Sequence, residues 1–303
     1  MGIFLSKAML ALAFVQSPVP PPADSMRASL WARVTADSTD GPAWLDLGRY
    51  YLRTSVPTRL DTVRAHAMLD TAQQAFVRAA RWSTGTRTAD SAQVFRVYTY
   101  GEHAYVDWEA GGGSAAATLA WHALPQDLRL PSVLEELGEN LLRACPHQGI
   151  LFTANEHDTQ AAWYLRFGRG LRPDLTVVPL DRWRSDSVLR NRMMREIKTK
   201  NPSLRALGEK RAVCASMGFE RPPEVQPSVK WNKRPLVWVS GKESKSDRVP
   251  AQDFVFAALR LALDQHETWS APALALYTRA AANVGGLCKA FETYGLSNEV
   301  GCR

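Results

Sequence analysis

The fold of this chain is decided by one stretch of sequence, GILFTANEHDTQAAWYLRFG at residues 149–168 followed by LRPDLTVVPL at residues 171–180. The stretch has the pattern of a strand, a polar turn, a helix and a second strand, at residues 150–153, 154–158, 159–167 and 175–180. This order predicts a βαβ unit with two parallel strands. The polar turn would then lie at the carboxyl edge of a sheet, where open α/β folds bind their ligands.

A similar pattern continues toward the C-terminus. Residues 235–240, PLVWVS, predict a third strand. We therefore expect residues 131–303 to form a small Rossmann-like α/β domain with a mainly parallel sheet, in which 150–153, 175–180 and 235–240 are parallel neighbours. Residues 201–234 contain prolines and show no periodicity, so we expect an irregular insertion there.

Helical periodicity dominates residues 23–130. The pattern W-x-x-L-G-x-x-Y at residues 44–51 resembles the first helix of a tetratricopeptide unit, in which the glycine lets the partner helix approach. Residues 63–82 fit the partner helix, and residues 93–126 fit a second, weaker unit. The expected fold is thus a domain of TPR-like helical hairpins followed by the α/β domain, with residues 40–130 all helical.

The N-terminus has the pattern of an export signal. Lys7 precedes an unbroken apolar stretch at residues 8–15, and the prolines of residues 16–22 stop any helix. The apolar stretch is too short to span a bilayer. We expect residues 1–22 to be a signal peptide or an N-terminal anchor, so that the protein is periplasmic or otherwise extracytoplasmic, free or membrane-associated. If the segment is cleaved, the mature chain begins between about residues 14 and 25.

Composition limits the classes of partner. Of the 303 residues, 46% are hydrophobic and 22% are charged, and the formal net charge is +7. This content supports packed cores and argues against wholesale disorder. Residues 182–200 contain seven Lys or Arg against two acids, which indicates either a solvated helix face or peripheral contact with an anionic membrane surface. Basic residues are not interleaved with stacking aromatics, so we expect no nucleic-acid partner.

The four cysteines are widely spaced and form no C-x-x-C pair, which excludes a zinc ribbon and a thioredoxin-type site. Three disulfide pairings are open, and Cys288–Cys302 is the local one that the spacing favours. Cys145 follows a predicted helix, where either a disulfide or a buried free thiol would fit.

Sequence motifs of catalysis are absent. The chain has no P-loop, no G-x-G-x-x-G after a strand, no G-x-S-x-G and no H-E-x-x-H, so we predict no catalytic residue, no metal and no cofactor. The remaining candidate for ligand binding is the turn Asn155-Glu156-His157-Asp158, whose polar groups could hold a small molecule or a sugar. The alternative is structural: Asp158 or Thr159 caps the following helix, and Glu156 and His157 face solvent.

The region also carries a family resemblance. A predicted helix ends at Cys145, and the motif residues after it are Phe152-Thr153, Asp158-Thr159, Trp163-Tyr164 and Arg172-Pro173-Asp174. Over residues 133–185 this pattern resembles the soluble C-terminal tail of an uncharacterised family of bacterial multi-spanning membrane proteins related to protein O-mannosyltransferases. The family's Asn-Gly-Asp-Asn is replaced here by residues 154–157 (ANEH), and its Pro-Leu by Ala161-Ala162. The resemblance implies the local fold and the compartment, and it implies no activity.

Two functions from different classes are consistent with these observations. The one favoured is an exported, non-enzymatic interaction or structural protein, such as an extracytoplasmic accessory subunit of a membrane complex. The alternative is a carbohydrate-binding or carbohydrate-processing protein that uses the 155–158 turn. Sugars stack on aromatic rings, and Trp163, Tyr164, Trp183 and Trp238 are near the predicted sheet, although core packing would equally explain them. Exposed rings beside the turn would favour sugar, and an apolar groove on the helices would favour a protein partner.

Overall fold

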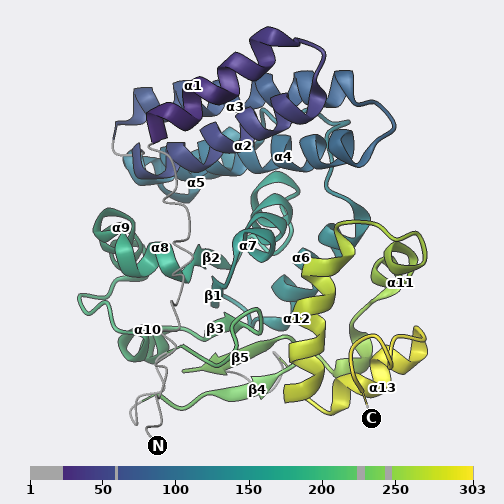
Figure 1. Ribbon diagram of the computed structural model, residues 1–303. Helices are drawn as coiled ribbons and strands as arrows, with labels where there is room; N and C mark the ends of the chain where they lie inside the picture. Colours follow the sequence, from purple (N-terminus) through teal and green to yellow (C-terminus); the bar gives the residue numbers. More distant parts are fainter. Residues whose placement is uncertain (1–22, 59–60, 224–228, 243–247, 303) are drawn as a thin grey trace, which may run out of the picture.

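Helices form the N-terminal part of the computed structural model, which describes residues 23–58, 61–223, 229–242 and 248–302 (Figure 1). The predicted signal segment, residues 1–22, lies outside the described residues. The first elements are α1 (Ala23–Ala36), α2 (Gly41–Thr58), α3 (Thr62–Trp82), α4 (Arg87–Asp107), the π-helical turn η1 (Trp108–Gly112) and α5 (Gly113–Trp121). In Figure 1 these helices form a layer across the top of the molecule, which we call the helical layer.

Small residues let the helices of this layer pack closely. A Cβ atom built on Gly48 of α2 would lie 2.5 Å from the ring of Phe76 on α3, so only glycine permits this approach. The prediction of paired helices is confirmed as far as Trp121, whereas residues 122–131 form turns and extended chain. The finer assignment to tetratricopeptide-type units stays a prediction.

A five-stranded mixed sheet follows in the chain. Its strands are β1 (Ile150–Thr153), β2 (Thr176–Pro179), β3 (Val213–Ser216), β4 (Asn232–Arg234) and β5 (Val237–Ser240). The order across the sheet is β2-β1-β3-β5-β4. β1 runs parallel to both β2 and β3, while β5 runs antiparallel to both β3 and β4. The predicted parallel pair 150–153 and 175–180 is therefore confirmed.

The prediction of a mainly parallel sheet is wrong. The strand predicted at 235–240 is antiparallel to β3 and is separated from β1 by it. Only Pro235 and Leu236 connect β4 to β5, and a connection of two residues can join only antiparallel strands. The expected irregular insertion at 201–234 is also corrected, because it contains β3 and β4 as well as the helix α10 (Leu204–Lys210).

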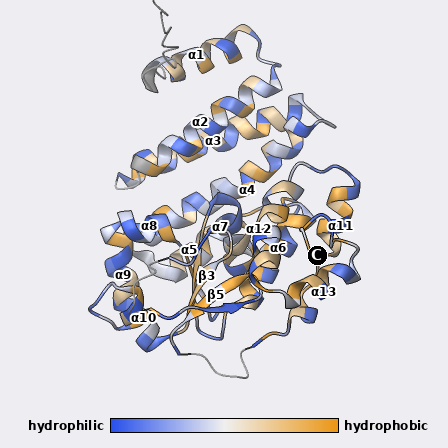
Figure 2. Cartoon of the chain, turned by 60° about the horizontal axis from the view of Figure 1, so that its bottom comes forward, coloured by the Kyte–Doolittle hydropathy of each residue, from blue (hydrophilic) through white to orange (hydrophobic). Residues whose placement is uncertain are grey.

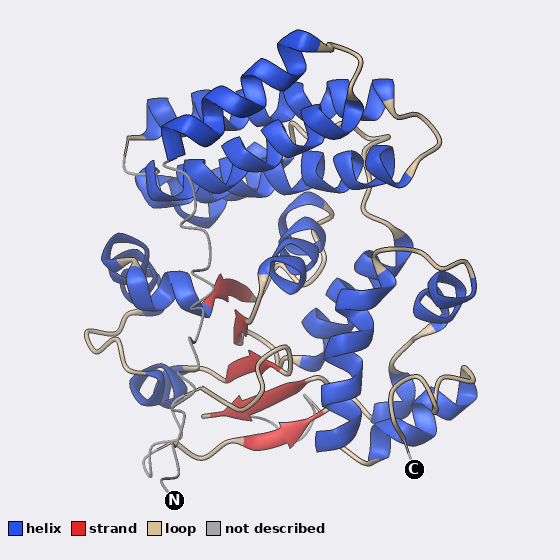
Figure 3. Cartoon of the chain, in the orientation of Figure 1, coloured by secondary structure: helices blue, strands red, loops and turns tan. Residues whose placement is uncertain are grey.

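Helices surround the strands, as Figure 3 shows. Besides α10 they are α6 (Ser132–Ala144), α7 (Glu156–Trp163), η2 (Tyr164–Gly168), α8 (Leu180–Ser185), α9 (Ser187–Ile197), η4 (Ala251–Asp253), α11 (Ala257–Asp264), α12 (Ser270–Asn283) and α13 (Gly286–Thr293). Every residue of β1, β3 and β5 is buried, and Figure 2 shows the hydrophobic colouring of β3 and β5. Strands covered on both faces are typical of an α/β arrangement. Its identity as a Rossmann-like fold stays a prediction.

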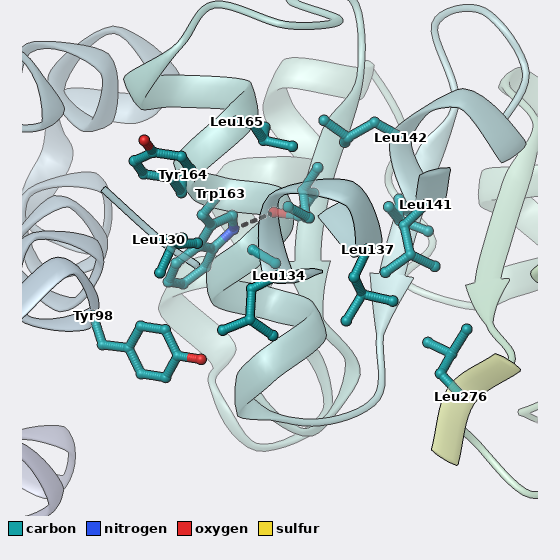
Figure 4. Close-up of a cluster of buried hydrophobic side chains, with 14 of the residues drawn as sticks. Tyr98, Leu130, Leu134, Leu137, Leu141, Leu142, Trp163, Tyr164, Leu165 and Leu276 are labelled. Atoms are coloured by element: carbon teal, nitrogen blue, oxygen red, sulfur yellow. Dashed lines mark hydrogen bonds between the residues drawn. The ribbon is translucent and has the colours of Figure 1, made fainter. Parts of the chain in front are cut away.

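The core between α6 and α7 places the turn that follows β1. A Cβ atom on Gly138 of α6 would lie 2.6 Å from the carbonyl oxygen of Ala161 on α7, so the two helices are in close backbone contact. Leucines of α6 fill the surrounding space, and Trp163 of α7 donates from Nε1 to the carbonyl oxygen of Val177 at 3.1 Å (Figure 4). This bond anchors α7 to β2.

Two disulfides link the described cysteines. Cys288 pairs with Cys302, as the spacing predicts. The sequence allowed either a disulfide or a free thiol at Cys145. In the structure Cys145 pairs with Cys214 and so joins the end of α6 to β3. Among the helices that the structure describes, none has both the length and the apolar content needed to cross a membrane.

Candidate functional site

The turn after β1 is a closed capping motif. Asn155 is the N-cap of α7, and its Oδ1 accepts from the backbone N–H groups of His157 at 2.9 Å and Asp158 at 3.1 Å. The Asp158 carboxylate accepts in return from the N–H groups of Ala154 at 2.9 Å and Asn155 at 2.8 Å. The cap is therefore Asn155, and the prediction that Asp158 or Thr159 would be the N-cap is wrong. Asp158 closes the reciprocal half of a capping box instead.

Asp158 also fills the crevice where an α/β fold usually binds its ligand. The strand order β2-β1-β3 places the topological switch point between β1 and β3. Asp158 is only 1% exposed, and a Cβ atom on Gly218, just after β3, would lie 2.8 Å from its Oδ2. Burial raises the pKa of Asp158 to about 6, against the lowering effect of its backbone hydrogen bonds. No room for a ligand remains at this side chain.

His157 faces the helical layer, so the expectation that it faces solvent is wrong. Its Nδ1 lies 2.9 Å from the hydroxyl oxygen of Tyr98 on α4, and its ring packs edge-on against Trp269 at 5.6 Å. Burial lowers the pKa of His157, and burial also raises the pKa of Tyr98 well above its ordinary value. Tyr98 therefore keeps its hydroxyl hydrogen, and the hydrogen bond between Tyr98 and His157 joins α4 to α7.

Asn155 and Glu156 point to the other side of the turn, where they line a hollow of about 410 Å³. We call it the carboxyl-edge hollow, because its walls include the residues that follow both β1 and β2. Its lining comprises Leu52, Arg53, Val56, Glu102, Ala154, Asn155, Glu156, Thr159, Gln160, Pro179, Asp181, Arg182 and Ser185. The helices α2 and α4 therefore contribute walls to a site that begins at the sheet. Two of the four predicted site residues meet here, while His157 and Asp158 do not.

A buried ion pair forms the deep wall of the carboxyl-edge hollow. Nη2 of Arg182 lies 2.7 and 2.9 Å from the two carboxylate oxygens of Glu102, and Gln160 donates to the same carboxylate at 2.9 Å. The Arg182 guanidinium also lies 4.2 Å from the ring centroid of Tyr105. Burial, and then the charge of Glu102, raise the pKa of Glu156 at the rim. Sequence reasoning missed this pair, because Arg182 falls in a basic run that suggests a solvated face.

The aromatic residues that would favour sugar binding are core residues. Trp163, Tyr164, Trp183 and Trp238 are all buried, and none lines the carboxyl-edge hollow. A sugar in this hollow could therefore form hydrogen bonds but could not stack on these rings. The hollow offers carboxylates, two side-chain amides and guanidinium groups, which suit a polar ligand.

A second hollow lies in the helical layer, between α1 and α2, and Arg53 belongs to the lining of both hollows. It has a volume of about 570 Å³, its exposed lining is mostly apolar, and its lining residues are Met26, Leu30, Asp46, Arg49, Tyr50, Arg53 and Thr54. We call it the α1–α2 groove. Met26 is 41% exposed, and Trp31 of the same helix is 39% exposed. Residues 23–36 have little apolar periodicity, so the sequence does not indicate an apolar face on α1.

Known proteins provide no further guide to either hollow. No family model, no curated protein and no solved structure matches this chain. The resemblance over residues 133–185 therefore stays a prediction, and function has to be inferred from the geometry of the two hollows.

Proposed function

We propose that the protein is an exported, non-enzymatic interaction protein that binds a segment of a partner protein in the α1–α2 groove. The observation that carries this proposal is the groove itself, with Met26 exposed at its edge. Single exposed apolar side chains are common, but an apolar groove between two helices suits the apolar face of a partner helix. An accessory subunit of a membrane complex is the setting that we propose for it.

The charges beside the groove indicate the chemistry of the partner. Arg49 and Arg53 line one wall, and the single acid of the lining, Asp46, already accepts from Arg33 at 3.1 Å. The groove therefore carries a net positive charge next to its apolar lining. An amphipathic helix with acidic residues flanking its apolar face would complement both features.

Two disulfides are compatible with an extracytoplasmic location, where such bonds persist. The capping role of the turn and the burial of the aromatic residues favour an interaction protein over a sugar-processing enzyme.

Site-specific photo-crosslinking in native membranes tests the proposal. A crosslinker at Met26 should capture one discrete partner, and Arg53→Glu in the same chain should weaken that product because it reverses the groove's charge. A crosslinker at Leu119, which is 71% exposed on α5 and far from the groove in sequence, is the matched control. Equal products from both positions, or a Met26 product that Arg53→Glu leaves unchanged, would contradict docking in the groove.

A second candidate function rests on the carboxyl-edge hollow. Asn155 and Glu156 line a space large enough for a small polar molecule, and an amide beside carboxylates can bind hydroxyl groups. Thermal melts with a panel of sugars and polyols test this: a ligand should raise the melting temperature of the parent and not of Glu156→Gln. Stabilisation that is identical in both proteins would rule out binding through Glu156.

A further inference from the structure

The π-helical turn η2 and the residue that follows it carry two arginines, Arg166 and Arg169. Single π-helical turns are found often at functional sites. η2 packs closely against the end of α5, since a Cβ atom on Gly168 would lie 3.2 Å from the ring of Trp121. The two arginines therefore lie where the chain after β1 meets the helical layer.

Another hollow opens between η2 and α5, and we call it the η2–α5 hollow. Its volume is about 530 Å³, within the range of small-molecule sites. None of its described lining residues belongs to the carboxyl-edge hollow or to the α1–α2 groove. The polar side chains of the lining are those of Ser114, Thr118, His122, Arg166 and Arg169, and the remaining lining residues are apolar or glycine.

The charge of the η2–α5 hollow is positive. Among the described residues that line it, none is acidic, and no ion pair joins Arg166 or Arg169 to a described acid. Asp174 lies close enough to act on the pKa of Arg166, but its two carboxylate oxygens accept from Arg172 at 2.9 Å each. The two guanidinium groups of the hollow thus have no counter-charge of their own in the lining.

Both guanidinium groups are held in place by neutral partners. Arg166 donates from Nε to the carbonyl oxygen of Leu175 at 3.0 Å and from Nη2 to the carbonyl oxygen of Pro173. Arg169 donates from Nε and Nη2 to the hydroxyl oxygen of Tyr164. Within the described chain, Nη1 of each arginine has no hydrogen-bond partner. Each planar fork is therefore preorganised, so a ligand at the free nitrogen orders little more of the side chain.

The electrostatics of Arg166 agree with this arrangement. Burial lowers the pKa of Arg166, although the charge of Asp174 acts in the opposite direction. The guanidinium is thus partly removed from water without full compensation by an acid. An anion in the hollow would supply that compensation.

We propose that the η2–α5 hollow binds a phosphate monoester, with its phosphate group held between Arg166 and Arg169. Such a phosphate carries about −1.5 to −2 charges at pH 7 and so matches two guanidinium groups, whereas a carboxylate carries one charge. The hollow is larger than a phosphate group requires, and the organic part of the ester lies against the apolar lining. A soluble sugar or glycerol phosphate and the headgroup of phosphatidic acid present the same chemical group.

Calorimetric titration of the full chain tests the proposal. Glycerol 3-phosphate is the soluble probe, and phosphatidylcholine vesicles that contain phosphatidic acid are the lipid probe. The parent should bind at least one probe saturably, and Arg169→Gln should weaken that binding by about tenfold or more, because a charged donor is lost. Arg205→Gln removes the same charge from an exposed arginine of α10, outside the hollow, and should bind as the parent does.

A second variant changes the charge of the hollow without altering η2. Ala115 is an exposed residue of α5 that lines the hollow, and glutamate is a good helix former, so Ala115→Glu should fold. Its carboxylate would pair with the arginines and repel the phosphate, so binding should again fall by about tenfold or more. Leu119→Glu adds the same charge at an exposed position of α5 outside the lining and should leave binding unchanged.

The pattern across probes and variants decides the outcome. Binding of glycerol 3-phosphate that weakens in Arg169→Gln and Ala115→Glu supports a soluble ester, and vesicle binding that weakens in the same two variants supports a lipid headgroup. Absence of saturable binding of either probe to the parent would overturn the proposal. Equal weakening in Arg205→Gln and Leu119→Glu would overturn it too, since it would indicate diffuse attraction to a basic protein. Acetate bound as tightly as glycerol 3-phosphate would likewise exclude a site built for phosphate.

Discussion

The carboxylate of Asp158 accepts two backbone hydrogen bonds while it is almost completely buried. Asp158→Ala should lower the free energy of unfolding by about 1–3 kcal/mol, because the N–H groups of Ala154 and Asn155 lose their partner. Asn155→Ala should cost about 0.5–2 kcal/mol through loss of the N-cap. Glu156→Ala, at the solvent-open rim of the carboxyl-edge hollow, is the control and should stay within about 0.5 kcal/mol. Urea denaturation measures all three. A cost for Glu156→Ala as large as that for Asp158→Ala would contradict the capping arrangement.

The pH dependence of Asp158→Ala provides an independent check on burial. The pKa of Asp158 in the folded chain, about 6, is above its ordinary value, so folding favours the protonated carboxyl. Its contribution is fully present below the unfolded value and falls as the pH rises through about 6. The stability difference between parent and variant should therefore shrink between pH 4 and pH 7. A difference that grows over this range would contradict the burial of this group.

Residue patterns alone could predict that the turn caps a helix, but not which residue does so. Asn155 and Asp158 both belong to the residue types found at N-caps, and they stand three positions apart, as the two halves of a capping box do. The choice depends on where the strand ends and the helix begins, and such boundaries shift by a residue or two with tertiary packing. The side-chain direction of His157 likewise depends on Tyr98, which is far away in the sequence.

At the scale of whole elements, Gly138 sets the distance between α6 and α7. Gly138→Ala should destabilise the protein by about 1–3 kcal/mol, because the new Cβ would lie 2.6 Å from the carbonyl oxygen of Ala161 and the helices would have to separate. Gly285→Ala is the matched control: no atom lies within 4 Å of the added Cβ, and φ is −56°. Thermal unfolding of both variants compares them. A loss in Gly285→Ala equal to that in Gly138→Ala would point to backbone entropy and not to helix contact.

The elements that the sequence predicted are those with a long apolar signal. β1 and β2 are apolar runs on either side of a helical segment, and their parallel pairing follows from the crossover between them. β3 consists of Val-Cys-Ala-Ser, which has a single β-branched residue, and β4 consists of three polar residues at the sheet edge. Neither segment has the alternating or continuous apolar pattern that predicts a strand. Both were therefore assigned to the irregular insertion. The antiparallel direction of β5 could not be predicted, because it follows from the short connection to β4, which the sequence pattern does not reveal.

At the scale of the whole molecule, an ion pair contributes to the contact between the helical layer and the helices that follow the strands. Glu102 of α4 is 6% exposed and pairs with Arg182 of α8. Glu102→Ala should cost about 3–5 kcal/mol, because the buried Arg182 guanidinium loses the carboxylate to which it is hydrogen-bonded. Asp264→Ala, which removes a partner of the more exposed Arg260, should cost less than about 1 kcal/mol.

Replacing both partners separates charge from packing in this contact. Glu102→Leu combined with Arg182→Met should restore much of the stability lost in Glu102→Ala, since a buried pair replaced by apolar groups is often nearly neutral. Chemical denaturation of the parent, Glu102→Ala and the double variant compares the losses. Equal losses in Glu102→Ala and in the double variant would show that the ion pair itself, and not the unpaired charge, determines the cost.

The candidate sites could be predicted from the sequence only where their residues are neighbours in the chain. Asn155 and Glu156 were found, because they follow a strand directly. Glu102 and Arg53 reach the same hollow from α4 and α2, and no local pattern connects them with the turn. The α1–α2 groove is missed for the same reason, because it exists only once two helices have packed.

The disulfide between Cys145 and Cys214 turns the central part of the chain into a covalent ring. Its ends are 69 residues apart in sequence, and between them lie β1, β2 and the helices α7 to α10. Closing a loop of this length reduces the conformational entropy of the unfolded chain, which raises the free energy of unfolding by about 4 kcal/mol. A single backbone break between α9 and α10 would open the ring without dividing the molecule, and both pieces would stay joined through sulfur. The part of the protein that carries the parallel strands is thus protected against one cut, and only a break together with reduction separates it.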